Sequence, residues 1–264
     1  MSKMLAEEAG ITHGFTTRRG GVSRPPFDSL DLGTGRDEPI DTIVANYSKL
    51  CSAYGLDLRE LALVRHEHGD NILKLTSEQC GRGITLPPLD YSDGFVTDDP
   101  GVTLTTCHAD CSAFFIYDKR TRCIGLAHAG WKGMFKRIGQ KLAQRLMLEY
   151  GADPKDMLAV IGPCICADCF EVETELARSF ASEFDCPDIY TVGGCAKEGA
   201  APRPDKACVA LQAAAVIQLM DAGLDIANIR RMDRCTMEDE YNFYSYRRDG
   251  ARTGSMAAFL KLVD

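Results

Sequence analysis

Hydrophobic and polar positions along the chain follow two periods, one typical of strands and one typical of helices. Short apolar runs predict strands at 11–17, 61–66, 94–97, 102–107, 112–118, 122–128 and 157–161. Apolar residues spaced by three or four predict helices at 41–54, 134–150, 172–184 and 209–222, with Asp41 as the N-cap of the first. We expect a loop at 191–206 and a closing strand or helix at 256–262. Because the elements lack a repeated βαβ period, the pattern predicts a mixed α/β fold rather than a barrel.

Composition narrows the class of protein. The chain has 264 residues, which fits one large domain spanning 1–264, and its 45% apolar and 26% charged residues are ordinary for a soluble globular protein. A formal net charge of −8 argues against nucleic acid or an anionic membrane as a partner. No apolar run reaches the roughly 18 residues that a membrane span needs. The N-terminus lacks the basic start and apolar core of a signal peptide, so we expect a cytoplasmic protein.

Residues that can perform chemistry concentrate in the segment 105–133. It contains His108 and His128, three of the twelve cysteines and the only tryptophan, Trp131. Polar, metal-capable side chains stand there at the ends of apolar runs. This arrangement is typical of strands that carry reactive groups to one rim of a sheet, and we expect the active centre there.

Two interpretations of this segment use the same atoms. With His68, residues Cys111 and His128 make a set of two imidazoles and one thiolate, which suits Zn²⁺ and leaves a fourth position for water or substrate. Alternatively, Cys111 is a nucleophile and His128 its base, with Asp110 or another acid orienting the imidazole. The spacing does not by itself demand a shared site. The third histidine favours the metal, because a Cys–His pair has no need of it.

The remaining histidines and cysteines have weaker claims. His68 is preferred to His66 as a ligand because Gly69 makes room beside it. Cys107 and His108 are expected to pack around the site, and His13 is expected to be structural. The cysteines at 164, 166 and 169 resemble part of a thiolate zinc site that lacks a clear second half. Structural cysteines near a strand-to-helix turn are the better interpretation of that group.

Anion binding is predicted at a glycine-containing turn. The segment Gly130-Trp131-Lys132-Gly133 follows a strand and opens a helix, where free backbone N–H groups attract anions and Lys132 adds positive charge. It is not a P-loop, because the spacing of that motif is absent. Two further pairs are candidate anion clamps, although such pairs are more often solvated surface: Arg18-Arg19 and Arg247-Arg248.

Taken together, these motifs resemble the YfiH family, also called the laccase-domain or multicopper polyphenol oxidase family. The resemblance covers essentially the whole chain in one order. Its elements are Gly20-Gly21-Val22-Ser23, Asn46, His68-Gly69, His108-Ala109-Asp110-Cys111, His128-Ala129-Gly130-Trp131-Lys132-Gly133, Ile161-Gly162-Pro163, Phe170-Glu171-Val172 and Tyr244-Ser245-Tyr246-Arg247-Arg248-Asp249-Gly250.

The resemblance implies a single α/β domain whose β-sandwich lies between helical layers. It implies a metal site made of His68, Cys111 and His128, with zinc as the metal and copper as the alternative. Members once regarded as copper laccases are now regarded as purine nucleoside phosphorylases. They convert adenosine, inosine and methylthioadenosine to the free base and ribose 1-phosphate, and some deaminate adenosine. A branch that edits peptidoglycan precursors keeps an amidohydrolase alternative open.

The chain departs from the family pattern at three places. His66 replaces a usual Gln, Ser112 replaces a usual Pro, and Ser255 stands where an arginine is expected, with Arg252 nearby. None of these changes removes a metal ligand.

The leading hypothesis is a zinc-dependent purine nucleoside phosphorylase and adenosine deaminase. Zinc would activate water for deamination, and inorganic phosphate would be the second substrate. Candidate phosphate- or substrate-binding residues are Lys132, Gly130, Arg18, Arg247, Arg248 and Asn46. A single metal site and five histidines argue against multicopper oxidase chemistry. The alternatives are a cysteine- or zinc-dependent amidohydrolase and a metal-stabilised binding protein without catalysis.

Overall fold

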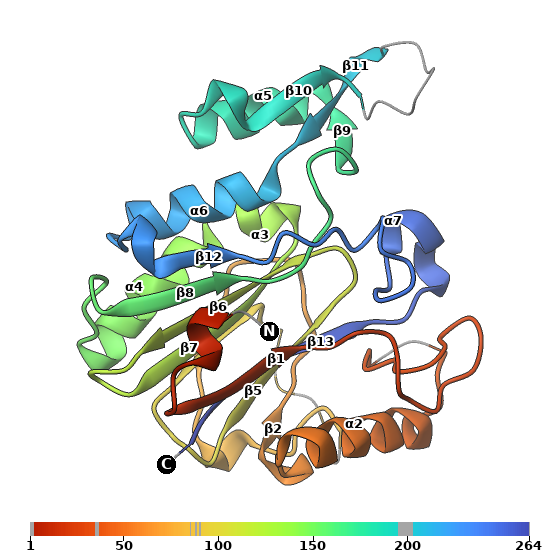
Figure 1. The fold of residues 1–264 in the computed structure, drawn as a ribbon, viewed down its shortest axis with the longest axis vertical. Coiled ribbons are helices and arrows are strands. Elements are labelled where there is room, and N and C mark those ends of the chain that lie inside the picture. Colours follow the sequence, from red (N-terminus) through yellow and green to blue (C-terminus); the bar gives the residue numbers. More distant parts are fainter. Residues whose placement is uncertain are drawn as a thin grey trace.

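The computed structural model describes residues 3–34, 37–84, 86–87, 89, 91–194 and 203–263. Its elements form four layers, helix, sheet, sheet and helix, which Figure 1 shows from bottom to top. The predicted α/β fold, a β-sandwich core flanked by helices, is confirmed. The order of the elements along the chain also explains why residues far apart in sequence meet at one edge of the sandwich.

The first sheet has four strands in the order β1-β13-β5-β2. They are β1 (Ile11–Phe15), β13 (Met256–Leu262), β5 (Thr103–His108) and β2 (Leu61–Ala62). The last strand of the chain therefore lies between β1 and β5 and pairs with both in antiparallel fashion. The sequence alone did not decide whether 256–262 forms a strand or a helix. It is a strand because it lies between two other strands of this sheet.

The second sheet has six strands in the order β12-β8-β6-β7-β4-β3. They are β12 (Ile229–Arg231), β8 (Met157–Ile161), β6 (Ser112–Asp118), β7 (Cys123–Ala129), β4 (Gly94–Thr97) and β3 (Ile72–Lys74). Every residue of β6 and β7 is buried. These central strands read as continuous apolar runs because both of their faces are covered.

Three apolar clusters hold the layers together. Phe95, Phe115 and Leu260 belong to the cluster between the two sheets. The helix α2 (Ile40–Tyr54) covers the outer face of the four-stranded sheet through a cluster that contains Tyr47. The helices α4 (Ile138–Tyr150) and α6 (Leu211–Asp221) cover the outer face of the six-stranded sheet.

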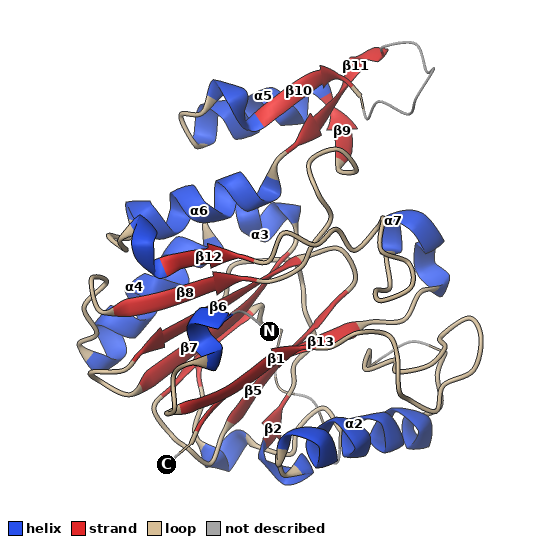
Figure 2. Ribbon diagram, viewed as in Figure 1, coloured by secondary structure: helices blue, strands red, loops and turns tan. Residues whose placement is uncertain are grey.

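The remaining elements lie around this sandwich. A small sheet, β10 (Tyr190–Gly193), β11 (Arg203–Val209) and β9 (Glu171–Glu173), packs with α5 (Thr174–Glu183) at one end of the molecule (Figure 2). The short helices are α1 (Lys3–Ala6), α3 (Trp131–Phe135) and α7 (Tyr246–Asp249), and the 3-10 turns are Leu58–Glu60, Ser77–Gln79, Pro187–Ile189, Ile226–Asn228 and Gly250–Arg252. Among the described residues, none of the helices is long and apolar enough to cross a membrane.

The structure corrects the helix predicted at 134–150, which is two helices, α3 and α4. They are separated at Arg137, whose φ is 63°. The buried side chain of Gln218 stabilises this break, because its Oε1 accepts the N–H of Gly139 at 2.9 Å and its Nε2 donates to the carbonyl of Met134 at 3.1 Å. Periodicity could not reveal the break, since the partner comes from α6.

Three smaller predictions also change. Helix α2 begins at Ile40 with Pro39 at the N-cap position, not Asp41. The strand predicted at 61–66 is only Leu61–Ala62, because the chain then turns towards the other sheet. Within the segment expected to be a loop, 191–206, the described residues at both ends belong to β10 and β11, and 195–202 lie outside the described residues.

Candidate metal-binding active site

Three predicted ligands meet at one edge of the sandwich. The side-chain ligand atoms of His68, Cys111 and His128 all lie within 4.8 Å of one another. His68 lies on the connection from β2 to β3, and Cys111 on the connection from β5 to β6. Both connections pass from the four-stranded to the six-stranded sheet, whereas His128 belongs to β7. The fold therefore assembles this set from three separate segments.

A tight turn presents Cys111. Residues 109–111 join β5 to β6, and Asp110 takes a φ of 85°, a conformation that costs free energy for a residue other than glycine. The Asp110 carboxylate stabilises the turn by accepting the Thr236 hydroxyl at 2.7 Å, the Ser245 hydroxyl at 2.9 Å and the backbone N–H of Arg247 at 2.7 Å. The carboxylate of Asp110 thus holds the backbone that carries Cys111.

The acid that contacts His128 is Asp93 and not Asp110, although the sequence had left the choice open between Asp110 and another acid. Asp93 is fully buried, and its Oδ1 lies 2.8 Å from Nδ1 of His128. The same carboxylate accepts the backbone N–H groups of Glu67 at 3.2 Å, His68 at 3.2 Å and Gly69 at 2.7 Å. Asp93 therefore fixes the His128 ring with Nε2 available, and it holds the turn that carries His68.

The electrostatics of the site favour a thiolate at Cys111. Burial opposes ionisation of the thiol, but the nearby His128 and His68 outweigh it and lower the Cys111 pKa to about 6. Burial also disfavours a charged His128, yet Cys111 and Asp93 outweigh it and raise the His128 pKa to about 9. For Asp93, burial is outweighed by His128 and by the N–H donors, and the pKa falls to about 2.

Of the three histidines expected to play no ligand role, His66 and His108 have both ring nitrogens engaged. Nδ1 of His66 lies 3.2 Å from the carbonyl of Ser92, and its Nε2 accepts the N–H of Cys107 at 3.1 Å. Nδ1 of His108 lies 3.0 Å from the carbonyl of Cys111, and Nε2 lies 2.8 Å from the Thr106 hydroxyl. Burial, together with His128, lowers the pKa of His66 to about 3 and that of His108 well below its usual value. Both rings are therefore neutral and lie beside the predicted ligands, and His66 also forms a group of possible metal donors with Asp93 and His128.

Gly130 lets the His68 ring approach the backbone. A Cβ at this position would lie 2.5 Å from Cδ2 of His68 and 3.3 Å from Sγ of Cys111. The first distance is shorter than any ordinary carbon contact, so only glycine fits without moving the ring. The residue predicted as part of an anion site is therefore also required for close packing of two predicted metal ligands.

The three predicted ligand residues face a pocket of about 960 Å³. Its aromatic side chains are Tyr91, Trp131, Phe170 and Tyr246, and its guanidinium groups are those of Arg65 and Arg247. The other lining residues are Gly33, Thr34, Val64, His66, Cys107, Ala109, Asp110, Gly130, Ile165, Leu211 and Ser255. Arg65 was not predicted. Its only signal in the sequence is its place at the end of an apolar run, directly before His66.

Four of the six predicted phosphate- or substrate-binding residues lie outside this lining. Lys132 is exposed, with Nζ 5.7 Å from the centre of the Trp131 ring. Arg248 donates to the carbonyls of Thr236, Met237 and Phe243 and is tied to its own loop. Asn46 is fully buried and donates to Ser23 and Asp31. Gly130 and Arg247 are the two that line the pocket.

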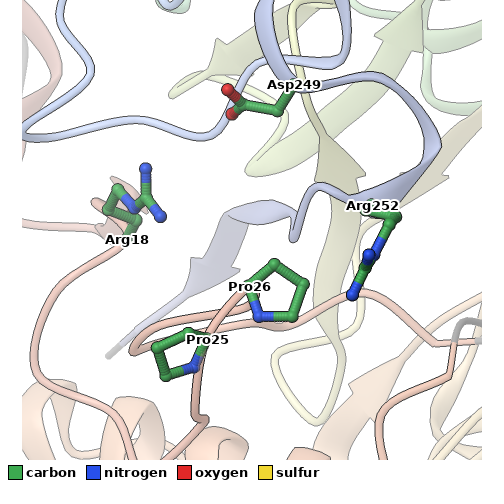
Figure 3. Close-up of a pocket in the computed structure, with 5 residues that line it drawn as sticks. All are labelled: Arg18, Pro25, Pro26, Asp249 and Arg252. Atoms are coloured by element: carbon green, nitrogen blue, oxygen red, sulfur yellow. The ribbon is translucent and has the colours of Figure 1, made fainter.

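The fourth, Arg18, lies in a separate hollow of about 570 Å³, lined also by Pro25, Pro26, Asp249 and Arg252 (Figure 3). Its Nε donates to the carbonyl of Asp28 at 3.0 Å, and its guanidinium stacks 4.5 Å from the centre of the Tyr244 ring. The side chain thus links the connection between β1 and α2 to the segment before α7, and it does not line the pocket that the predicted metal ligands face.

The donor set suits one metal ion. Two imidazoles and a thiolate are ligands that zinc accepts, and an ion there would keep a coordination position towards the pocket. Asp93 behind His128 is the supporting hydrogen bond that such sites use. The structure therefore has groups that can hold a metal ion at the pocket floor.

Comparisons with known proteins agree with this picture. A family model described as multi-copper polyphenol oxidoreductase laccase matches residues 12–263. Purine nucleoside phosphorylase YlmD of Bacillus subtilis is 32% identical over 258 residues, covering 96% of this chain and 89% of that protein. A purine nucleoside phosphorylase of Deinococcus radiodurans is also 32% identical, over 259 residues, covering 98% and 92%. The crystal structure of the Bacillus licheniformis hypothetical protein YfiH superposes with a TM-score of 0.88 at 29% identity, covering 96% of this chain and 93% of that one.

Proposed function

Because this chain belongs to the multi-copper polyphenol oxidoreductase laccase family, and because relatives that cover nearly all of it carry the name purine nucleoside phosphorylase, we propose that it cleaves purine nucleosides with inorganic phosphate. The proposed substrates are adenosine, inosine and methylthioadenosine. The products are the free base and the corresponding ribose 1-phosphate. We further propose that the enzyme deaminates adenosine and that it depends on zinc.

The observation that carries this proposal is the composition of one pocket. Metal-capable donors, two arginines and four aromatic side chains face the same space of about 960 Å³. Aromatic faces suit a purine base, since stacking contributes about 1–3 kcal/mol per base. Guanidinium groups suit phosphate, because they form paired, charge-assisted hydrogen bonds. A purine nucleoside and a phosphate therefore both find complementary groups there.

Arg65 and Arg247 are the proposed phosphate ligands. Phosphorolysis requires a phosphate aimed at C1′ of the ribose, together with stabilisation of the charge that develops on the departing purine. Nη1 of Arg247 already donates to the carbonyl of Glu171 at 2.9 Å, and its guanidinium lies 5.2 Å from the centre of the Phe170 ring. These contacts hold the side chain in one orientation against the pocket wall.

His68, Cys111 and His128 are the proposed zinc ligands. Zinc bound there would supply Lewis-acid chemistry, which deamination needs. Asp93 would keep His128 in the ligating tautomer, and Asp110 would hold the turn that carries Cys111, so Asp110 is a positioning residue. Laccase chemistry requires several coppers and more histidine ligands. His13 and His108 do not line the pocket, and both ring nitrogens of His66 are hydrogen-bonded within the protein, so the proposed site draws on His68 and His128.

The test is incubation of zinc-loaded protein with adenosine, with and without inorganic phosphate, followed by chromatography. Phosphate-dependent adenine identifies phosphorolysis, and inosine formed without phosphate identifies deamination. Cys111→Ser should abolish both products, whereas Cys186→Ser, a free half-buried cysteine that is not a pocket-lining residue, should keep them. Absence of both products from the folded, zinc-loaded wild type would rule out the nucleoside proposal.

A second candidate follows from the arrangement of Cys111, His128 and Asp93. A thiol near an imidazole that is held by a carboxylate also occurs in cysteine amidohydrolases. Under this alternative, the metal-free protein would release products from a peptidoglycan-type amide without phosphate. Chelated protein that gains amidase activity would favour it. Binding of a nucleoside with no turnover of either substrate would favour a binding protein.

A further inference from the structure

A second group of metal-capable side chains lies apart from the three-ligand site. The ligand atoms of Cys166, Cys169, Cys235 and Glu238 all lie within 4.8 Å of one another. The three thiols are free, and Cys166 and Cys235 are 69 positions apart in the sequence. We refer to these four residues as the cysteine cluster. Three of its members are thiols, the side chain that zinc prefers in structural sites.

The cluster has two arms, each with two residues between its ligands. In the first arm, the N–H groups of Cys169 and Phe170 donate to the carbonyl of Cys166 at 3.2 and 3.0 Å. In the second, the N–H of Asp239 donates to the carbonyl of Cys235 at 3.1 Å. Each arm is therefore a tight turn that brings its two ligands to the same side. Zinc sites commonly combine two such pairs.

Main-chain hydrogen bonds hold the arms together. Cys164 and Cys235 form a parallel bridge, in which the N–H of Thr236 donates to the carbonyl of Cys164 at 3.1 Å. Across the cluster, the N–H of Cys166 donates to Sγ of Cys235 at 3.4 Å. The arrangement is thus set by the backbone and does not depend on an ion to bring distant segments together.

The neighbouring cations have other partners. Arg234 forms an ion pair with Asp239. Nη1 of Arg247 donates to the backbone carbonyls of Cys169 and Glu171. Within the cluster, Sγ of Cys169 contacts Oε1 of Glu238 at 3.6 Å, a long and weak hydrogen bond. A metal ion would satisfy all four side chains at once.

We propose that Cys166, Cys169, Cys235 and Glu238 bind a Zn²⁺ ion in a tetrahedral site separate from the active site. A Zn–S bond of about 2.3 Å implies ligand atoms about 3.8 Å apart. The observed limit of 4.8 Å means that the ligands must close by no more than about 1 Å, which side-chain rotation can supply. Since the protein fills all four positions, the ion is structural and not catalytic.

The ion would stabilise the wall of the active-site pocket. Thr236 lies within the second arm and donates its hydroxyl to Asp110, and the N–H of Ile165, beside the first arm, donates to the Asp110 carbonyl at 3.0 Å. Phe170, directly after the first arm, lines the pocket. The ion would also close the long excursion that contains α5 and α6, and cross-links that close long loops stabilise most in principle.

Zinc content of the purified full-length protein tests this proposal. The protein is saturated with Zn²⁺, passed over a desalting column and analysed by mass spectrometry. His68→Ala removes a ligand of the active site only, so this variant should retain one equivalent of zinc. Adding Cys235→Ser should remove that equivalent, whereas adding Cys186→Ser should not. Glu238→Gln should weaken zinc binding in a competition titration and leave the fold unchanged.

Spectroscopy covers the case in which Cys235→Ser fails to fold. X-ray absorption of zinc-loaded His68→Ala protein should show three sulfur ligands at about 2.3 Å and one oxygen. Three outcomes would overturn the proposal: no zinc in folded His68→Ala protein, a zinc shell without several sulfurs, or thiol titration that finds Cys166 and Cys169 joined as a disulfide in the zinc-treated protein. None of these readouts depends on nucleoside turnover, so failure here is distinct from failure of the proposed function.

Discussion

Oδ1 of Asp93 lies 2.8 Å from Nδ1 of His128, and the same buried carboxylate accepts the backbone N–H of His68. One side chain thus orients two of the three proposed metal ligands. A carboxylate behind a metal-binding histidine fixes the tautomer and raises the basicity of the ligand. The arrangement makes Asp93 part of the proposed metal site through its hydrogen bonds to His128 and to the backbone of His68.

Asp93→Asn should lower zinc affinity at the active site by about 10–100-fold, the usual effect of losing such a partner. The amide cannot accept the His128 N–H and the three backbone N–H groups as a carboxylate does. Competition with a chromogenic chelator measures the change. Asp70→Asn is the matched control, since Asp70 is close in sequence to His68 but forms half-exposed ion pairs with Lys136 and Lys141. Equal affinities in both variants would contradict the role given to Asp93.

Gly130→Ala should displace the His68 ring. The added methyl group would lie 2.5 Å from Cδ2 of His68, and overpacking of this kind costs about 1–3 kcal/mol. We expect zinc affinity to fall by about tenfold or more, and the free energy of unfolding to fall by about 1–3 kcal/mol. Gly101→Ala is the control. The added methyl group would lie 3.1 Å from Oδ1 of Asp99, and neither residue lines the pocket. An unchanged zinc affinity would show that His68 does not need its present position.

Arg65→Ala should raise the KM for phosphate more than the KM for nucleoside. Loss of one charge-assisted hydrogen bond costs about 1.5–3 kcal/mol, which corresponds to about a tenfold to hundredfold increase. Steady-state kinetics with each substrate varied in turn gives both values. Lys132→Ala, which removes an exposed cation outside the pocket lining, should change neither. If Lys132→Ala raised the KM for phosphate and Arg65→Ala did not, the phosphate would bind at the turn Gly130–Gly133 and not at Arg65.

His13 should make the protein less stable as the pH falls. Burial lowers its pKa from 6.5 to about 4, so the folded state holds the ring neutral while the unfolded chain binds a proton. The stability is complete above pH 6.5 and is lost as the pH falls towards 4. The loss between pH 7 and 5 should be about 2 kcal/mol.

Urea unfolding of wild type and His13→Asn at both pH values isolates this contribution, because the other histidines are the same in the two proteins. The free-energy difference between them should change with pH by that amount. A constant difference would mean that His13 titrates alike in both states. His13 packs edge-on against Phe115 with ring centres 6.3 Å apart, so the substitution also carries a constant packing cost.

Periodicity predicted the strands and helices whose own apolar pattern decides their structure. The runs at 112–118 and 157–161 match β6 and β8, and the helix at 41–54 matches α2 within a residue. It failed where a distant partner decides the local structure, as at Arg137, whose helix break depends on Gln218. Such contacts join residues about 80 positions apart and leave no mark in the local pattern.

The same reason explains what was missed at the sites. The ends of apolar runs and the motif resemblance together indicated His68, Cys111 and His128, but Asp93 was not recognised. Its signal was weak: an acid directly before the apolar run that becomes β4. Asp93 matters to the proposed site because it accepts three backbone N–H groups, and these groups come close to it only in the folded chain.

The sequence likewise did not predict the second half of the cysteine cluster. Cys235 and Glu238 lie far along the chain, and the pairing of Cys164 with Cys235 brings them beside Cys166. A search for two cysteine pairs close in sequence could not have found them.

The two connections that carry His68 and Cys111 both pass from one sheet of the sandwich to the other. An ion held by these residues would therefore link the two sheets. It could not stay bound if the two sheets moved apart. Binding to the folded state alone adds to the free energy of unfolding in proportion to the logarithm of ion concentration. The melting temperature of this protein would then rise with the concentration of free zinc. Release of the metal would accompany the first separation of the two sheets.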